Sequence, residues 1–141
     1  MIRRPQFYQA LFQQVAPTLD AAYVNHSKMV ELLRDPGVRI TTVEDPDGGQ
    51  SFPIRGWMRG LADWRRKLTA FGADHRQRVT DEFPALAAAL EGYLASSGVI
   101  LAAYRSLLAR YTTADGHLTV QEIAAADRDA LAAMIEAELE A

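Results

Sequence analysis

One register of side chains, continuous from Thr80 to Tyr111, constrains the fold of this chain more than any other feature. Its positions recur at alternating intervals of three and four residues: Phe83, Leu86, Leu90, Leu94, Ser97, Leu101, Tyr104, Leu108 and Tyr111. That spacing places one side chain per turn on a single helix face. It predicts one long helix, with residues 95–98 (ASSG) as a candidate bend because serine and glycine are common at kinks. Two helices with a tight joint are the alternative.

Three other stretches show helical spacing. Leu19, Tyr23, His26, Val30 and Leu33 form one stripe, which ends before the sequence DPG at residues 35–37. A second stripe holds Trp57, Leu61, Trp64, Leu68 and Phe71, and Gly72 follows as the expected stop. The last helix is expected from about Val120 to about Glu140, with Ile123, Leu131, Met134 and Ile135 facing inward. The tryptophans follow the apolar register, so we assign them to the core.

A shorter helix is expected at the N-terminus. Pro5 suits a first helical turn, and Phe7, Leu11 and Val15 then recur at intervals of four residues. Pro17 is predicted to interrupt or kink this helix, because proline lacks the backbone N–H and clashes with the preceding turn.

Residues 38–55 have the composition of strands and a turn. VRITTVE (38–44) is rich in β-branched residues, DPDGGQ (45–50) is rich in turn-forming residues, and SFPIR (51–55) follows. This order predicts a short two-stranded hairpin. Pro53 would place the second strand at a sheet edge. An isolated hairpin is marginal in water, so it must pack on helices or on a partner.

Length and composition then limit the fold class. The chain has 141 residues, of which 49% are hydrophobic and 23% charged, as expected for one folded domain. We therefore expect a single domain over residues 1–141. It is mainly α, a bundle of about five helices with a β-hairpin at about 38–55 between the second and third. The absence of cysteine excludes a disulfide scaffold and a cysteine nucleophile, and it fits a reducing compartment. We expect a cytoplasmic protein without a signal peptide and without a membrane span.

Residues 111–123 (YTTADGHLTVQEI) resemble the second half of an EF-hand calcium loop. The resemblance implies that Gly116 is the sharp-turn glycine, Leu118 the apolar position and Glu122 the bidentate ligand, with Asp115 at the fifth position. Tyr111 stands at the first ligand position and Thr113 at the third, where the family uses aspartate or asparagine. Only two carboxylates therefore remain in the loop.

A structural alternative explains the same residues, and the sequence favours it. Thr119 and Glu122 fit a capping box, in which each side chain accepts from the other residue's amide at the start of a helix. Asp115 and Gly116 would then form the turn between two helices. Whether the loop holds an ion is left open by the sequence.

No arrangement of residues in the sequence matches a known catalytic site. The three histidines, at 26, 75 and 117, have no partners at metal-ligand spacing. His26 lies on an apolar stripe, where a histidine is either a core residue or a ligand to something bound. There is no nucleophile elbow, P-loop or dinucleotide fingerprint. We therefore predict a protein that is not an enzyme, with no catalytic residues, no metal site and no cofactor.

Charge is segregated along the chain. Residues 55–78 have a net charge of +5, whereas residues 79–141 have a net charge of −7. The basic residues of the first segment are the predicted partner-binding site: Arg55, Arg59, Arg65, Arg66, Lys67, Arg76 and Arg78. Glu136, Glu138 and Glu140 lie at the end of the last helix, where the helix dipole disfavours anions. Either that end frays or a positive group meets it.

These features lead to three hypotheses of function. The first is a non-catalytic protein–protein interaction protein: an adaptor, an inhibitor or immunity-type protein, or a subunit of a larger assembly such as a phage or secretion particle. Its partner would be another protein or further copies of itself. The second is a small-molecule- or ion-responsive helical module that uses a pocket near His26 or the loop near Asp115. The third is nucleic-acid binding by residues 55–78.

Overall fold

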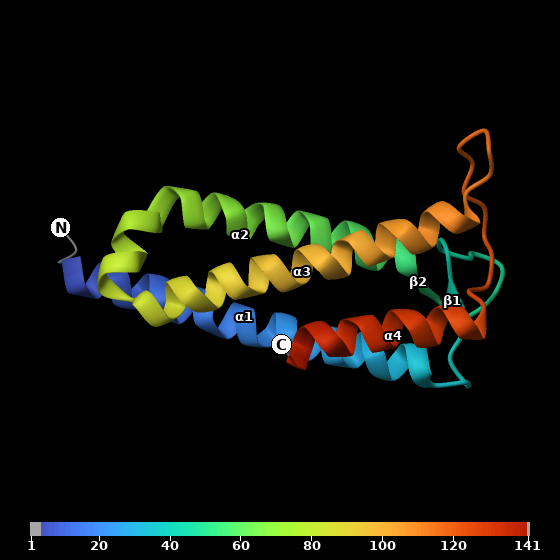
Figure 1. Cartoon of the computed structure of the whole chain (residues 1–141), viewed down its shortest axis with the longest axis horizontal. Coiled ribbons are helices and arrows are strands. Elements are labelled where there is room, and N and C mark those ends of the chain that lie inside the picture. Colours follow the sequence, from blue (N-terminus) through green and yellow to red (C-terminus); the bar gives the residue numbers. More distant parts are fainter. Residues whose placement is uncertain (1–3, 141) are drawn as a thin grey trace.

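The structure is a computed structural model that describes the backbone of residues 4–140 and the side chains of residues 17–19 and 21–140. Its helices are α1 (Arg4–Arg34), α2 (Ile54–Glu82), α3 (Pro84–Tyr111) and α4 (Ala125–Glu140). Two short strands, β1 (Ile40–Thr41) and β2 (Phe52–Pro53), lie between α1 and α2. Consecutive helices run in opposite directions, with the strands at one end (Figure 1). The mainly α fold class is confirmed.

The described chain has four helices and not about five, because Pro17 does not end α1. The helix runs through this residue from Arg4 to Arg34. Pro17 lies on the exposed face of the helix, and Leu19, two residues later, is buried. Packing of the following stripe therefore offsets the lost backbone hydrogen bond. The predicted stripe of Phe7, Leu11 and Val15 lies outside the described side chains.

The boundary between α2 and α3 differs from the predicted one. Gly72 does not end α2. It lies inside the helix facing α3, where a Cβ atom would lie 3.4 Å from Leu90 Cδ2. The break comes at Phe83, with φ −135° and ψ 64°, directly before Pro84. Proline disfavours helical geometry in the residue before it but suits the first turn of the next helix. The apolar register that begins at Phe83 continues across this break, because the Phe83 side chain packs against the core.

The long apolar register is otherwise a single helix. α3 runs from Pro84 to Tyr111 without interruption at residues 95–98. Ser97 is fully buried there, and its hydroxyl donates to the carbonyl of Leu94 at 3.3 Å. The small residues of ASSG thus serve packing within one helix, which settles the choice between one helix and two for the described residues after Pro84.

Two hydrophobic clusters hold the helices together. α2 packs chiefly on α3, and α1 chiefly on α4, while α1 makes few contacts with α2. The larger cluster lies towards the strands and includes Ile54, Tyr104 and Ile135, each at most 1% exposed. The smaller cluster joins α1, α2 and α3 through Leu19, Leu68 and Tyr93. Trp57 is partly buried against the first cluster and Trp64 against the second, as the register predicts.

The predicted β-hairpin is wrong in its topology, because β1 and β2 pair in parallel. Ile40 is opposite Phe52 and Thr41 is opposite Pro53. The N–H of Phe52 donates to the Arg39 carbonyl at 3.0 Å. Among the described residues β2 pairs with β1 alone, so Pro53 lies on an edge strand as predicted.

A third segment from near the end of the chain completes this ladder. Thr41 forms an antiparallel bridge with Glu122 on the other side of β1. The N–H of Thr42 donates to the Gln121 carbonyl at 2.9 Å, and the N–H of Ile123 donates to the Ile40 carbonyl at 2.9 Å. β1 is therefore the central segment, and its main partner on this side is remote in sequence.

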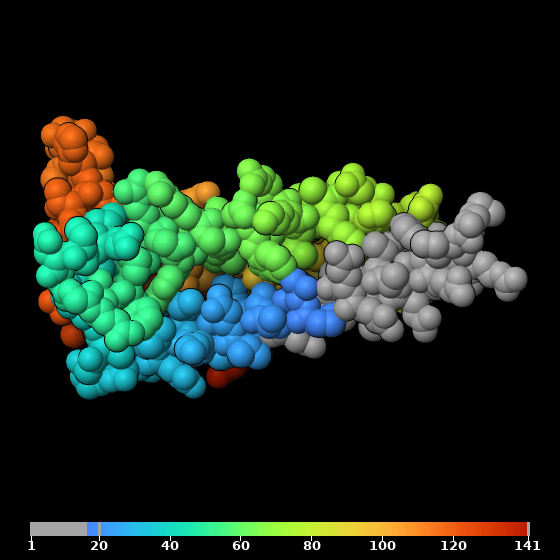
Figure 2. Space-filling view, turned by 180° about the vertical axis from the view of Figure 1, so that it is seen from behind, coloured from blue at the N-terminus to red at the C-terminus, as the bar shows by residue number. Residues whose placement is uncertain are grey.

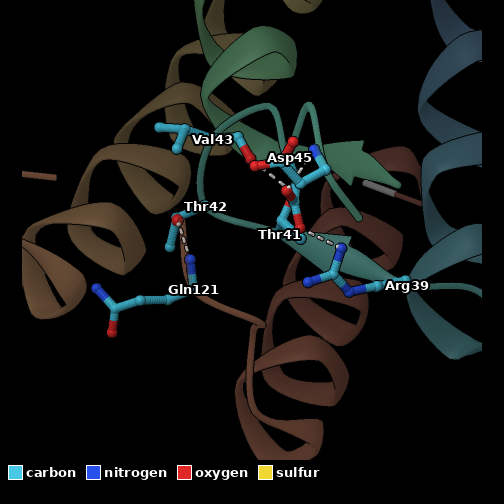
Figure 3. A network of polar contacts seen from close by, with 7 residues as sticks. Arg39, Thr41, Thr42, Val43, Asp45 and Gln121 are labelled. Atoms are coloured by element: carbon cyan, nitrogen blue, oxygen red, sulfur yellow. Dashed lines mark hydrogen bonds and ion pairs between the residues drawn. The ribbon is translucent and has the colours of Figure 1, made fainter. Parts of the chain in front are cut away.

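The predicted hairpin turn is a longer loop organised by an ion pair. Arg39 Nη1 lies 2.7 Å from Asp45 Oδ2, and this contact holds the pKa of Asp45 below its usual value (Figure 3). A Cβ atom at Gly48 would lie 2.0 Å from Asp45 Oδ2 and 2.2 Å from Arg39 Nη1. Only glycine fits beside this pair. Gly49 has φ +72°, so the loop turns back towards β2 at that residue.

Arg128, in the first turns of α4, links this helix to the C-terminal end of α1 and to the residues that follow it. Its guanidinium donates to the carbonyls of Leu33 and Leu32, both at 2.9 Å, and of Val38 and Asp35, both at 2.7 Å. The side chain is only 9% exposed. The last carbonyls of a helix have no partner within it. Arg128 therefore caps the C-terminus of α1.

An exposed ion pair adds to the contact between α1 and α4. Arg34 Nε and Nη2 donate to the two carboxylate oxygens of Glu136, at 3.0 and 3.1 Å. The cation that meets the acidic end of α4 at Glu136 thus comes from the last turn of α1.

Candidate functional site

The predicted partner-binding residues all lie on α2, but their side chains have different environments. Arg59, Arg66, Lys67, Arg76 and Arg78 are exposed, whereas Arg55 and Arg65 are half-buried. Arg66 and Lys67 both contact Asp63, and Lys67 Nζ lies 3.3 Å from Asp63 Oδ2. These surface contacts are weak. One acidic group therefore faces two cations, and net positive charge remains on this helix.

Arg65 is held within the fold. Its Nε donates to Ser97 Oγ at 3.0 Å, and its Nη2 donates to the Leu94 carbonyl at 3.1 Å. A Cβ atom at Gly98 would lie 3.0 Å from Arg65 Nη2. Because glycine has no side chain, the guanidinium of Arg65 has room to lie against α3 at this position. Arg65 is predicted as a partner-binding residue, and the structure places it as a clamp between α2 and α3.

Two adjoining depressions lie along the seam between α2 and α3. One, of about 540 Å³, is lined by Arg55, Arg105 and His117 together with Met58 and Leu108. The other, of about 460 Å³, also reaches Arg105 and is lined by Arg65, Arg66 and small apolar residues. No acidic side chain lines either depression among the described residues. We call this pair of depressions the basic seam.

Arg105 is the residue of the basic seam that sequence reasoning missed. It lies on α3, in a segment whose overall charge is negative, so counting charge along the chain hides it. Its exposed position next to the buried Tyr104 marks it as outward-facing, but its proximity to Arg55 depends on how α2 packs on α3.

The remaining basic residues extend from this surface. Arg76 and Arg78 line a shallow depression near the end of α2, together with Asp74 and His75. Arg59 lines none of these depressions, and no ion pair is found for it among the described side chains. The seven predicted residues are therefore spread along α2 and do not line one pocket.

The loop after α3 forms a compact turn. The N–H of Gly116 donates to the Thr113 carbonyl at 2.9 Å, and Gly116 has φ +84°. The predicted turn at Asp115 and Gly116 is therefore confirmed. The Thr113 hydroxyl contacts the Asp115 carboxylate, and this hydrogen bond lowers the pKa of Asp115. Glu122 belongs to the bridge beside β1. Within the part of the chain that the structure describes, no group of three acidic or histidine side chains is placed to hold a metal ion.

The predicted capping box at Thr119 and Glu122 is wrong. α4 begins at Ala125, and the Thr119 carbonyl accepts from the Thr42 hydroxyl at 2.7 Å. Tyr111 caps this helix instead. Its hydroxyl accepts the N–H of Ala124 at 2.9 Å and donates to Asp127 Oδ2 at 2.6 Å. This hydrogen bond lowers the pKa of Asp127.

We expect Tyr111→Phe to lower the free energy of unfolding by about 1 kcal/mol at neutral pH, the usual cost of a lost helix cap. The pKa of Asp127 should rise towards its ordinary value, because the hydrogen bond from Tyr111, which contributes most to lowering it, is removed. A carboxyl group whose pKa is lower in the folded state than in the unfolded state stabilises the fold above about pH 4. This stabilisation is lost as the pH falls through the pKa of the folded state. The difference between the variant and wild type should therefore shrink in acid.

Urea unfolding at pH 7 and at pH 3, with an NMR titration of Asp127, measures these effects. Tyr23→Phe is the matched control, because Tyr23 packs edge-on against Tyr93, far from this cap. Equal losses of stability in the two variants at pH 7 would contradict the capping role.

His26 lies on the buried face of α1 and is 4% exposed. Its Nε2 is 3.2 Å from the Tyr93 hydroxyl, and burial lowers the pKa of the imidazole. The side chain also lines a cavity of about 400 Å³ between α1 and α2. The sequence identifies the stripe on which His26 lies, but the cavity depends on the separation between two helices.

The expectation of no membrane span stays a prediction, and α3 is the described helix that bears on it. By length and composition alone this helix could cross a membrane. Its apolar side chains have another explanation here, because nine of its residues are buried against the other helices, among them Leu90, Ile100 and Leu108.

In comparisons with family models, with curated proteins and with solved structures, nothing matches this chain.

Proposed function

We propose that this chain is a non-catalytic interaction protein that docks an acidic segment of another protein, or of a second copy of itself, in the basic seam. One observation supports this most: Arg55, Arg66 and Arg105 from two helices line adjoining depressions without an acidic side chain among the described lining residues. Arginine recognises carboxylates in a paired, directional manner. The non-catalytic role and the cytoplasmic location remain predictions from the sequence.

The lining of the basic seam favours a peptide over a nucleic acid. Met58, Leu108 and Leu118 provide apolar contact in one depression, and Leu101 does so in the other. A lining that combines apolar side chains with arginines is typical of protein–protein interfaces. Single-stranded nucleic acid usually stacks on aromatic side chains. Both tryptophans line the cavity between α1 and α2 and not the basic seam.

Charge reversal at Arg105 tests the proposal. We expect Arg105→Glu to reduce recovery of a bound partner about tenfold, since it places a carboxylate against the acidic segment. Lys28→Glu is the matched control, because it makes the same change of charge at an exposed position of α1. The measurement is affinity purification of each variant from the native source, with quantitative mass spectrometry, before and after nuclease treatment.

The outcomes separate the hypotheses. A protein lost with Arg105→Glu but retained with Lys28→Glu supports the proposal. Recovery that disappears after nuclease treatment indicates nucleic-acid binding instead. Concentration-dependent sedimentation of the wild-type chain, abolished by Arg105→Glu, identifies a second copy as the partner. Identical recoveries and sedimentation for both variants would contradict a role for the basic seam.

A small-molecule-responsive module is the second candidate function. The cavity beside His26, with buried polar atoms that have no partner among the described residues, favours it.

A further inference from the structure

A third depression continues the basic seam along the same pair of helices. It has a volume of about 380 Å³ and is lined by Val79 of α2 and by Leu90 and Leu94 of α3, among others. Thr69 and Ala73 line both this depression and the second depression of the basic seam. The three depressions therefore form one continuous groove between α2 and α3, which we call the long groove.

The residues that line the long groove recur at helical spacing on both helices. Intervals of three, four or seven residues place them on one face of each helix. Because an α-helix rises about 1.5 Å per residue, the groove extends for about 32 Å between the levels of Ala87 and Leu108. The repeating positions are Ala62, Arg66, Thr69, Ala73, Arg76 and Thr80 on α2, and Ala87, Glu91, Leu94, Leu101, Arg105 and Leu108 on α3.

The long groove opens away from α1. Ala62 and Thr69 each follow a core residue, Leu61 or Leu68, by one position, which is about 100° round the helix. No described residue lines both the groove and the cavity beside His26. Figure 2 shows the side on which α1 (blue) lies next to α2 (green), with atoms of α3 (gold) visible between them. The groove is therefore on the outside of the bundle.

Short side chains line the middle of the long groove. Arg65 closes the groove between the helices, where its guanidinium donates to Ser97 Oγ and to the Leu94 carbonyl. Packed helices approach to about 8–10 Å between their axes, and small residues at the contact allow the closer distances. A third helix could therefore lie along α2 and α3 here. The alanines concerned are Ala62, Ala70, Ala73 and Ala87.

The walls of the long groove favour a helical occupant over an extended one. α2 and α3 are continuous helices along the groove, so their backbone groups are bonded within each helix and offer no strand edge. An extended peptide would place its own N–H and C=O groups over apolar side chains without partners. A helix bonds these groups internally and presents only side chains to the groove.

Basic side chains gather at one end of the long groove. Arg55 and Arg105 line the end near the strands, and Arg66 lines the adjoining depression. At the other end, Arg76 and Glu91 provide one charge of each sign. A partner helix that fits this distribution has carboxylates at the end near Arg105 and mainly apolar side chains along the rest of one face.

The chain itself does not offer such a helix. Residues 1–16 contain no aspartate or glutamate. Among the described residues, the exposed large apolar side chains are single valines on different elements: Val24 on α1, Val99 on α3 and Val120 in the loop before α4. No described helix face therefore combines a row of exposed large apolar side chains with carboxylates, which favours another protein over a second copy.

We propose that the long groove binds an amphipathic α-helix of another protein, with the acidic end of that helix at Arg55 and Arg105 and its apolar face over Leu90 and Leu94. The inference rests on the proposed function, because the basic seam is one end of this site. It adds that the partner segment is helical and continues beyond the basic seam. With α2 and α3 it would form a unit of three helices packed through periodic apolar side chains.

Photo-crosslinking of the full chain in an extract of the native source tests the helical form. Benzoylphenylalanine replaces Glu91 or Ala109, which are exposed positions of α3 that line opposite ends of the long groove. About 18 residues separate them, or about 27 Å. We expect links to two points about 18 residues apart in one segment of the partner. An extended segment would cover that distance in about 8 residues. Ala89 is the control, because it is exposed on α3 and lines none of the three depressions.

The outcomes separate this inference from the proposed function. Links from Ala109 without links from Glu91 confine the partner to the basic seam, which leaves the proposed function standing and overturns the helix. A spacing near 8 residues also overturns it. Links to the sequence of this chain identify a second copy as the occupant and overturn the choice of another protein. No link from either position overturns the inference, and the comparison of Arg105→Glu with Lys28→Glu then decides on the proposed function.

A binding measurement gives a second readout. The probe is a synthetic peptide of the linked segment. Ala73→Gln puts a longer neutral side chain in the middle of the long groove and should weaken binding of this peptide at least tenfold. Ala89→Gln makes the same change outside the groove and should leave the affinity unchanged. Far-UV circular dichroism checks that both variants fold, and it should show the peptide gaining helix when it binds. Equal affinities for the two variants, or no gain of helix, overturn the proposal.

Discussion

Arg128→Met should lower the free energy of unfolding by about 3–5 kcal/mol, the largest effect that we expect of any substitution outside the aliphatic core. Methionine keeps the length and apolar stem of the side chain but removes every donor. The four carbonyls of Leu32, Leu33, Asp35 and Val38 then lose a charged partner at 2.7 to 2.9 Å. Because the site is buried, water replaces these bonds only in part.

Urea unfolding followed by circular dichroism measures this loss. Arg110→Met is the matched control, because Arg110 is exposed and its one ion pair among the described residues is with Asp127, at 2.6 Å. An exposed pair of this kind contributes about 1 kcal/mol or less. Arg128→Lys should fall between the two, since one ammonium cannot reach four carbonyls in different directions. If Arg128→Met costs no more than Arg110→Met, the capping of α1 by Arg128 is not important for stability.

The apolar periodicity of the sequence predicted the helices well, because the same spacing that makes a stripe also determines which face is buried. Leu33, Leu61 and Leu101 lie on the predicted stripes and are 2%, 7% and 4% exposed. His26, which occupies a stripe position, is buried as well. A periodic pattern over several turns leaves few alternatives, so fold class and core faces followed from the sequence.

The ends of the helices could not be predicted in the same way. Pro17 has helix on both sides, whereas Pro84 starts a new helix. Gly72 lies inside α2, facing Leu90 of α3. Proline and glycine have local preferences of a few kcal/mol at most, and packing of the whole helix decides whether these prevail.

The strand topology depended on a contact that no local pattern contains. Residues 38–55 have the composition of a hairpin, yet β1 lies between β2 and residues 121–123. The residues of DPDGG fit the loop for a different reason, since Gly48 accommodates the ion pair between Arg39 and Asp45. Turn-forming residues showed where the chain reverses, but not which segments pair.

The candidate sites were predictable only in part. Counting charge along the chain found Arg55 and Arg66, but Arg105 comes from another helix and Arg65 is a packing residue. The stripe of α1 indicated that His26 faces inward. It could not show that a cavity lies between α1 and α2 at that level, because the separation of two helices depends on how each packs on the rest of the bundle.

Thr42→Val should lower the free energy of unfolding by about 2–3 kcal/mol, because valine keeps the shape of threonine and removes only its hydroxyl. That hydroxyl is fully buried between two remote parts of the chain. It donates to the Thr119 carbonyl at 2.7 Å and accepts the N–H of Gln121 at 3.0 Å, as seen for Gln121 in Figure 3. The variant leaves both backbone groups without this partner, in the segment that joins the ladder to α4.

The loss should be local before it is global, which distinguishes it from a general packing defect. The N–H of Ile123 donates to the Ile40 carbonyl in the same ladder, so its hydrogen exchange should become faster in Thr42→Val, whereas amides in the middle of α3 should change only as much as global stability does. Thr119→Val is the control, because the Thr119 side chain is exposed and only its backbone carbonyl takes part. If both variants unfold at the same urea concentration, the Thr42 hydroxyl does not hold residues 119–123 to β1. The ladder would then depend on its backbone bonds and on burial of Ile40 and Ile123 alone.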